Sequence, residues 1–218
     1  MTEKVIQFWT SRAGKDFDRK AGRSGRLPAI ERLAEWARPH LMGDQTTAID
    51  LGCGTGLFAQ AVGNRNIIGI DCSESFAEIA RQRMDKVILQ SLFEVQFPPS
   101  SIGQASSLFV IDDYPIDQKR AFFRQIFAWL KPGGRLFFAA YSPNDERMGT
   151  HKVQINQASQ ADFTIYLEEA AVYESLLSAG GFQILQSELL TAKGYYQNLG
   201  AASIAVGREF ILLEAQKL

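Results

Sequence analysis

The stretch AIDLGCGTGLF, residues 48–58, places three glycines within five positions directly after a short apolar run. Glycine inside a helix or strand costs up to about 1 kcal/mol relative to alanine. A plain strand-to-helix turn needs only one glycine, so three of them predict a loop that lets the backbone approach a ligand. The stretch therefore predicts a strand, a ligand-binding loop and the start of a helix.

The pattern on either side of this loop alternates between strands and helices. Apolar runs predict strands, which in chain order are Thr47–Leu51, Asn66–Asp71, Lys86–Gln90, Ala105–Asp112, Arg135–Tyr141, Phe182–Leu189 and Ala202–Phe210. Helical periodicity and capping residues predict the helices, which are Leu27–Pro39, one from Leu57, Ser73–Arg83, Ile116–Leu130 and Leu167–Ala179. This order predicts an α/β, doubly wound, mainly parallel seven-stranded sheet with helices on both faces.

Composition limits the classes of function. A length of 218 residues suits one domain, and a net charge of −1 gives no general attraction to nucleic acid or to an anionic membrane. No apolar run reaches the roughly 18 residues of a membrane span, and the first ten residues lack a signal-peptide pattern. Two cysteines and two histidines are too few for a disulfide framework or a zinc cluster. We expect no metal and a reducing, cytoplasmic location.

The spacing of the glycines separates two classes of cofactor. Dinucleotide-binding loops follow the pattern G-x-G-x-x-G, whereas here the third glycine, Gly56, comes one residue early. An NAD-linked oxidoreductase is therefore the weaker alternative. The sequence DLGCGTG instead resembles the first signature of the Rossmann-like S-adenosylmethionine (SAM) methyltransferases, which is an acid followed by alternating glycines. The resemblance extends well from Asp44 to Tyr141, including the turn LKPGGRLFF, and beyond Phe163 through element order only.

This resemblance implies SAM as the cofactor and assigns residues to it. The loop would wrap the amino-acid half of SAM, with the acid Asp50 beneath it; its other members are Gly52, Cys53, Gly54 and Gly56. Asp71 ends a strand about twenty residues after Asp50, where related folds place a ribose-binding acid. Residues expected beside the adenine are Cys72, Ser73, Ser91, Leu92 and Phe93. Ser91 departs from the family pattern, which has an acid at that position.

The acceptor pocket is expected where the strands end. Asp112 and Asp113 follow the fourth strand, and alternation along a strand would turn only one of them into the pocket. Repulsion between the two carboxylates would raise one pKa and suit it to act as a base, with Asp112 favoured, although either acid could simply cap the helix near Ile116. His151 is a further candidate. Tyr114 and Tyr141 are expected to bind the substrate.

Two segments are expected to cover the site. Residues 1–43 are predicted to form a helical lid, in which Phe8, Trp9 and Phe17 would contact the substrate and seal out water. Gly14, Gly22 and Gly25 would serve as hinges. Its basic residues are either a solvated face or a feature that favours an anionic substrate. The polar stretch 142–162 is too long for an ordinary connection and is expected to border the acceptor.

The resulting hypothesis is a single-domain, small-molecule methyltransferase that acts on O, N or C. A SAM-binding regulatory or assembly protein without transferase activity is the alternative. Nucleic acid is not expected as a partner, because no Asn-Pro-Pro-Tyr-type sequence follows the fourth strand and the net charge is near zero. The chain is expected to be a monomer or a homodimer.

Overall fold

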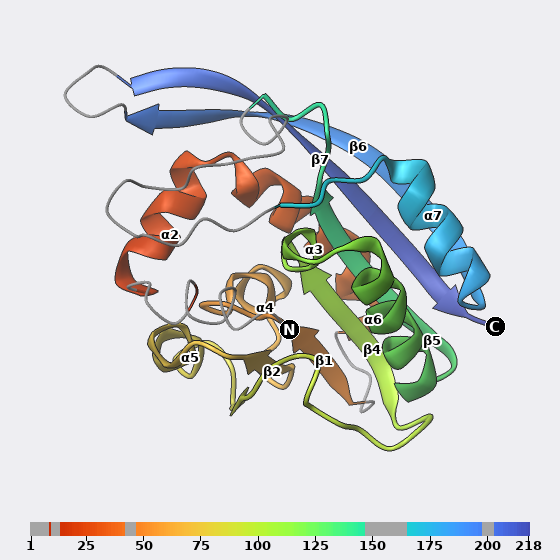
Figure 1. Cartoon of the computed structure of the whole chain (residues 1–218). Helices are drawn as coiled ribbons and strands as arrows, with labels where there is room; N and C mark the ends of the chain where they lie inside the picture. Colours follow the sequence, from red (N-terminus) through yellow and green to blue (C-terminus); the bar gives the residue numbers. More distant parts are fainter. Residues whose placement is uncertain (1–8, 10–13, 42–46, 147–164, 198–202) are drawn as a thin grey trace.

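The computed structural model describes residues 9, 14–41, 47–146, 165–197 and 203–218 (Figure 1). The helices are α2 (Gly14–Arg23), α3 (Arg26–Leu41), α4 (Leu57–Val62), α5 (Glu74–Ala80), α6 (Ile116–Trp129) and α7 (Ala170–Ala179), with a 3₁₀ turn, η1 (Ile111–Asp113). The strands are β1 (Ala48–Leu51), β2 (Ile68–Asp71), β3 (Lys86–Leu89), β4 (Ile102–Leu108), β5 (Leu130–Tyr141), β6 (Phe182–Gln197) and β7 (Ser203–Lys217). No helix within these residues is long and apolar enough to cross a membrane.

The strands form one seven-stranded sheet in the order β3-β2-β1-β4-β5-β7-β6. The first five strands pair in parallel, and β7 pairs antiparallel with both β5 and β6. Strand order reverses between β1 and β4, and ligands bind at such a point outside the carboxyl ends of the strands. The predicted fold is therefore confirmed, and the glycine loop lies at the reversal.

Side chains of β5 show how the sheet is covered on both faces. Leu136, Phe138 and Ala140 belong to the apolar cluster that α6 and α7 complete. The alternate residues, including Phe137 and Ala139, belong to the cluster formed with α3 and α4. Because neighbouring side chains of a strand point to opposite faces, this one strand supports both helical layers. The sheet is thus buried on both sides, as a parallel sheet requires.

Several boundaries differ from those predicted. Residues 131–134 were expected to form a turn, but they lie inside β5, where Gly133 has a φ of 77°. The pairing of β4 with β5 shifts register there, since Ile102 is opposite Leu130 and Gln104 is opposite Arg135, so residues 131–134 interrupt the regular pairing within the strand. The fourth strand also ends at Leu108, four residues earlier than predicted.

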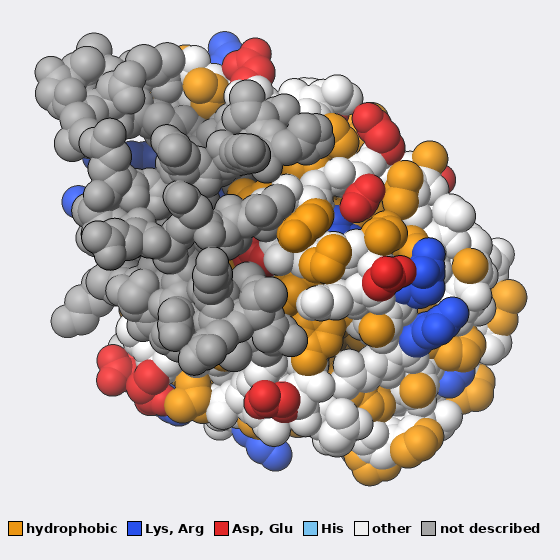
Figure 2. Space-filling model, viewed as in Figure 1, with side chains coloured by type: hydrophobic (Ala, Val, Ile, Leu, Met, Phe, Trp, Pro, Cys, Tyr) orange, Lys and Arg blue, Asp and Glu red, His pale blue; other side chains and the backbone are white. Residues whose placement is uncertain are grey.

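The last two strands are much longer than the sequence pattern indicates. Their pairing continues from Phe182 opposite Lys217 to Gln197 opposite Ser203. Figure 1 shows this hairpin extending past the other strands toward α2. Figure 2 shows acidic and basic side chains interspersed around α6 and α7, so no basic tract covers that part of the described surface. Of the segment 142–162, the described part ends at Glu146.

Candidate functional site

A pocket opens at the carboxyl ends of β1, β2 and β4, beneath α2 and the start of α3. It contains about 970 Å³ of empty space, part of which is open solvent at its mouth. Residues predicted from the sequence that line it are Trp9, Phe17, Asp50, Gly52, Cys53, Gly54, Asp71, Cys72, Ser91, Leu92, Asp113 and Tyr114. The structure therefore brings most of the predicted cofactor residues together in one cavity.

The glycine loop has a backbone that only glycine adopts readily. Gly52 and Gly54 have φ angles of 72° and 53°, in the left-handed region that disfavours a Cβ. A Cβ on Gly52 would also lie 2.4 Å from Cγ2 of Val110. Gly56 has a φ of 80° and precedes α4, but it faces α5 rather than the pocket. Two of the three glycines thus shape the cavity, and the third shapes the packing of helices.

Asp71 closes the loop from the end of β2. Its carboxylate accepts hydrogen bonds from the backbone N–H of Gly54 at 2.8 Å and from that of Ser73 at 2.9 Å. Burial raises the pKa of Asp71, while these backbone donors oppose the rise. Each carboxylate oxygen has two lone pairs, so Asp71 keeps acceptor capacity for a ligand hydroxyl.

Asp50 lies beneath the loop in a more enclosed setting. It is 2% exposed, and its Oδ1 accepts a hydrogen bond from the Ser106 hydroxyl at 2.7 Å. Burial raises the pKa of Asp50 to about 7; Ser106 opposes the rise, and the nearby Asp71 charge adds to it. A carboxyl with such a pKa can be neutral or charged near pH 7, depending on what binds beside it.

Two residues that were predicted to lie beside the adenine do not line the pocket and instead support the packing of the fold. Ser73 is fully buried at the N-cap of α5, where its backbone N–H binds Asp71. The Phe93 ring packs against Tyr114, with ring centroids 4.9 Å apart, and does not line the pocket. The adjacent Ser91 and Leu92 do line it.

The two acids after β4 occupy different environments. They lie in η1 rather than on the strand, so strand alternation does not describe them. Asp113 lines the pocket, and its Oδ2 accepts a hydrogen bond from Nε1 of Trp9 at 2.6 Å. Asp112 is 2% exposed and lies outside the pocket lining. The expectation that Asp112 is the acid that faces the pocket is therefore wrong; of the two acids, Asp113 lines it.

Asp112 instead belongs to a buried polar cluster. It accepts hydrogen bonds from the Tyr173 hydroxyl at 3.0 Å and from the backbone N–H of Tyr141 at 3.2 Å. The ammonium of Lys119, which is 0% exposed, donates to the same Tyr173 oxygen at 3.1 Å and to Glu168 at 3.3 Å. Burial raises the pKa of Asp112 to about 6, and Lys119 opposes that rise. Burial, not repulsion from Asp113, is thus the main cause.

Aromatic residues of the N-terminal part contact the pocket. Phe17 of α2, Trp9 and Phe76 of α5 form a cluster of three rings, with centroid distances of 6.4 Å for Trp9–Phe17, 4.8 Å for Phe17–Phe76 and 6.2 Å for Trp9–Phe76. Tyr114 lines the cavity, whereas Tyr141 is 5% exposed and stands behind Phe109, at a centroid distance of 5.1 Å. Phe8 and His151 lie outside the described residues, so their predicted roles stay predictions.

A polar contact joins α2 to the glycine loop. Asp18 accepts a hydrogen bond from the Thr55 hydroxyl at 2.5 Å and from Nη2 of Arg83 at 2.6 Å. Arg83 also donates to the backbone oxygen of Thr55 at 2.8 Å. The three residues therefore fix the helix above the loop. At the other end of α2, Gly25 has a φ of 75°, and a Cβ there would lie 3.0 Å from the Lys193 oxygen, which indicates a packed corner rather than a hinge.

We expect Asp18→Asn to loosen this helix. Removing the charge weakens both contacts, so amide exchange of α2 measured by mass spectrometry should speed up about fivefold to tenfold. Asp117→Asn is the matched control, because Asp117 pairs with Arg120 on exposed α6. Equal exchange of α2 in the parent and in Asp18→Asn would show that this contact does not hold the helix.

Several lining residues were not given an individual role from the sequence, although six of them lie in the glycine-loop stretch 48–58 or in the predicted lid 1–43. They are Ala21, Arg26, Ile30, Thr55, Leu57, Phe58, Ile70, Phe76, Leu108, Phe109 and Val110. Phe109 has a φ of 60°, rare for a bulky residue and common at functional sites, and no sequence pattern reveals it. Phe76 could have been found, since it lies one turn into the helix that follows Asp71.

The amino-acid sequence is similar to those of known methyltransferases. Residues 49–138 match the family described as a methyltransferase domain. Trans-aconitate 2-methyltransferase from Delftia acidovorans is 26% identical over 188 residues, which are 84% of this chain and 63% of that protein. Ubiquinone biosynthesis O-methyltransferase from Coxiella burnetii is 27% identical over 147 residues, which are 64% of this chain and 59% of that protein. The chain thus spans less than two thirds of the length of both relatives.

A solved structure shares the whole fold. Magnesium protoporphyrin IX methyltransferase from Synechocystis PCC 6803, with bound SAM, has a TM-score of 0.66 at 17% identity. The match covers 100% of this chain and 98% of that one. At this identity the likeness concerns the fold.

Proposed function

Because this chain has the Rossmann-like fold of SAM-dependent methyltransferases and carries their domain at residues 49–138, we propose that it transfers a methyl group from SAM to an O, N or C atom of a small-molecule metabolite. One observation carries the proposal: a single cavity joins the loop glycines and Asp71 to Asp113 and an aromatic cover. Relatives named for trans-aconitate and ubiquinone biosynthesis support a small-molecule acceptor.

The residues present fit this cofactor. Gly52 and Gly54 present backbone without a Cβ at the pocket wall and would hold the amino-acid end. Asp71 has acceptor capacity for the ribose hydroxyls, and Ser91 and Leu92 would flank the adenine. When bound, SAM supplies a methyl group already activated by its sulfonium. The chain's own task is then to position the acceptor and to exclude water.

On the acceptor side, Asp113 is the proposed proton acceptor. It is the carboxylate on the β4 side of the cavity, and the Trp9 indole donates to it, which fixes its orientation. An O or N acceptor loses a proton as the methyl group arrives, and a positioned base typically contributes about 10²–10⁴-fold to such a step. Tyr114 forms part of the wall beside it.

The proposal treats residues 1–218 as one domain. Residues 1–43 would form a lid, which the contacts of Trp9, Phe17 and Asp18 with the pocket region support. Residues 142–162 would border the acceptor. Cys53 and Cys72 are both free thiols, which supports a reducing, cytoplasmic location. A monomer or a homodimer without nucleic acid remains the expectation.

Labelled methyl transfer tests the function. The protein is incubated with SAM that carries a trideuteriomethyl group and with a metabolite extract, and products are searched for a mass increase of one labelled methyl. At least one labelled small molecule is expected, absent when S-adenosylhomocysteine is added in excess. Intact cofactor binding without any labelled product would contradict the transferase proposal.

Asp113→Asn should separate catalysis from binding. Loss of the base should lower kcat at least about tenfold, while the affinity for S-adenosylhomocysteine stays within about twofold. Steady-state kinetics with the identified acceptor and calorimetry measure the two quantities. A variant with full kcat would mean that transfer depends on positioning alone and that Asp113 only orients Trp9.

A further inference from the structure

Arg26 is the only lysine or arginine among the described residues that line the pocket. Its Nε donates to the Ser24 hydroxyl at 3.2 Å, and its guanidinium carbon lies 5.1 Å from the Phe17 ring centroid and 5.9 Å from that of Tyr141. Within the described part of the chain, no carboxylate forms an ion pair with it. Aromatic faces orient a guanidinium, but they do not neutralise its charge.

Neighbouring arginines differ in this respect. Arg83, beside the glycine loop, pairs with Asp18 at 2.6 Å. Arg208, which is 2% exposed, pairs with Asp145 at 2.6 Å. Both of these cations have a carboxylate partner inside the fold, whereas Arg26 presents its charge to the cavity. This difference points to a partner that comes from outside the chain.

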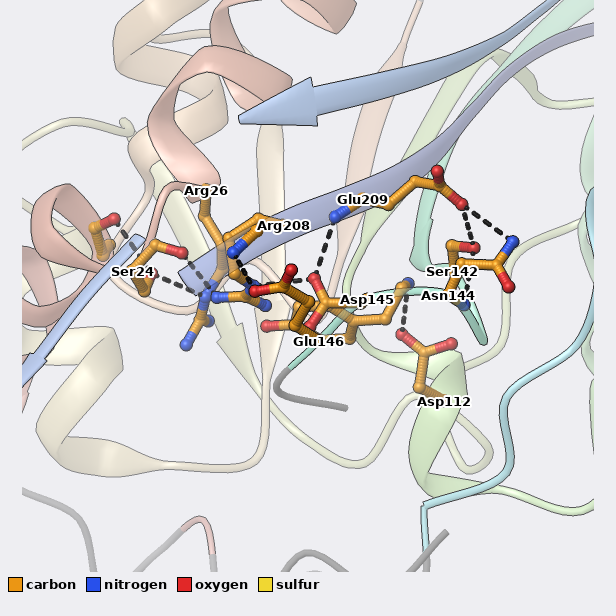
Figure 3. A network of polar contacts seen from close by, with 12 residues as sticks. Ser24, Arg26, Asp112, Ser142, Asn144, Asp145, Glu146, Arg208 and Glu209 are labelled. Carbon is orange, nitrogen blue, oxygen red and sulfur yellow. Dashed lines mark hydrogen bonds and ion pairs between the residues drawn. The ribbon is translucent and has the colours of Figure 1, made fainter. Parts of the chain in front are cut away.

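The position of Arg26 is fixed by a buried network (Figure 3). The Ser24 backbone oxygen accepts a hydrogen bond from Nη1 of Arg208 at 2.5 Å. Arg208 is in turn fixed by Asp145, and Gly25 has no room for a Cβ against β6 and β7. The start of α3 is therefore anchored on the hairpin, and a side chain presented from such a corner loses little freedom on binding a ligand.

Arg26 lies near the end of β5. Its guanidinium is beside the ring of Tyr141, the last residue of that strand. It is also beside the ring of Phe17, an atom of which is 3.9 Å from the position of a Cβ on Gly54 in the glycine loop. The end of β5 is separated from β1 by β4, on the side away from Asp71.

We propose that Arg26 binds an anionic group of the methyl acceptor, and that the acceptor is a carboxylate-bearing metabolite. The inference rests on the proposed function and narrows it to one substrate class. A guanidinium offers a carboxylate two parallel N–H donors. Asp113 lines the same cavity, so the residue that would bind the anionic group differs from the proposed proton acceptor.

The test divides the metabolite extract by charge. Anion exchange at neutral pH gives a retained and an unretained fraction, and each is incubated with trideuteriomethyl SAM. Labelled product is expected from the retained fraction. With that acceptor, Arg26→Gln should raise KM at least about tenfold with kcat within a few-fold, and Arg26→Lys should recover part of the loss.

Controls separate this inference from its alternatives. Arg23→Gln, at an exposed position of α2 that does not line the pocket, should keep the parent KM. S-adenosylhomocysteine should bind Arg26→Gln as tightly as the parent; a weakened affinity, with 5′-deoxy-5′-methylthioadenosine unaffected, would show that Arg26 serves the cofactor carboxylate and overturn the inference. Labelled product from the unretained fraction alone, or an unchanged KM, would also overturn it. No labelled product in either fraction would contradict the proposed function itself.

Discussion

Gly54→Val is expected to weaken binding of S-adenosylhomocysteine by about 100-fold. The φ of 53° at Gly54 lies in the left-handed region, where a β-branched residue is strained by roughly 1–3 kcal/mol. In the free variant the loop can relax and relieve that strain. Binding the ligand would require the strained conformation again, and this lowers the affinity. The valine side chain would also project into the space that the loop leaves open. Isothermal calorimetry measures the change.

Gly63→Val is the matched control for this variant. Gly63 has a φ of 82°, ends α4, and a Cβ there would meet nothing within 4 Å. It therefore brings the same kind of backbone strain without touching the pocket. We expect Gly63→Val to lose about as much thermal stability as Gly54→Val and to bind S-adenosylhomocysteine with the affinity of the parent. If the two variants bound S-adenosylhomocysteine equally well, the glycine loop would not be the cofactor cradle.

Asp112→Ala is expected to produce the largest loss of stability. It removes a buried acceptor from Tyr173 and from the Tyr141 backbone, and it leaves the fully buried Lys119 with less compensation. Losses of this kind amount to about 3 kcal/mol, or about 6–12 °C in Tm for a chain of this size. Thermal unfolding followed by circular dichroism measures the shift.

The neighbouring acid gives the comparison. Asp113→Asn should change Tm by less than about 3 °C, because Asp113 lies in the cavity wall rather than in the cluster. The two variants are thus expected to differ in kind: Asp112→Ala loses stability, and Asp113→Asn loses turnover. If Asp112→Ala unfolded at the parent temperature, the buried cluster would not be supporting η1 and the segment that follows residue 164.

The sequence was sufficient to predict the fold, and most of the residues that it assigned to the cofactor line one pocket. The order of apolar runs and the spacing of the glycines predicted a parallel sheet with its loop after β1, because both depend on local pattern. Asp71 was found for the same reason, since it ends a strand at a fixed distance from the loop. The extent of β6 and β7 was missed, because both strands are extended by pairing: residues 190–197 of β6 pair with the start of β7, and residues 211–217 of β7 pair with β5 and with the start of β6.

The sequence could not predict which side chains near the proposed acceptor point into the pocket. Asp112 and Asp113 are adjacent, and only the 3₁₀ geometry of η1, together with Lys119 of the next helix and Tyr173 of the distant α7, decides which of them faces the cavity. Arg26 was one of several basic residues in the N-terminal part. Arg26 is distinctive because no acid among the described residues pairs with it. This could not be predicted, because its surroundings include Tyr141, which is more than a hundred residues away in the chain.

The central claim is that this cavity binds SAM through the glycine loop and Asp71. The most direct measurement is calorimetric titration of the intact protein with S-adenosylhomocysteine, together with the variant Asp71→Ala. We predict micromolar affinity for the parent, about −8 kcal/mol, and a loss of at least about tenfold in the variant, because two hydroxyl contacts to a charged group are removed. A parent dissociation constant weaker than about 1 mM, or equal affinities for the parent and Asp71→Ala, would contradict the account.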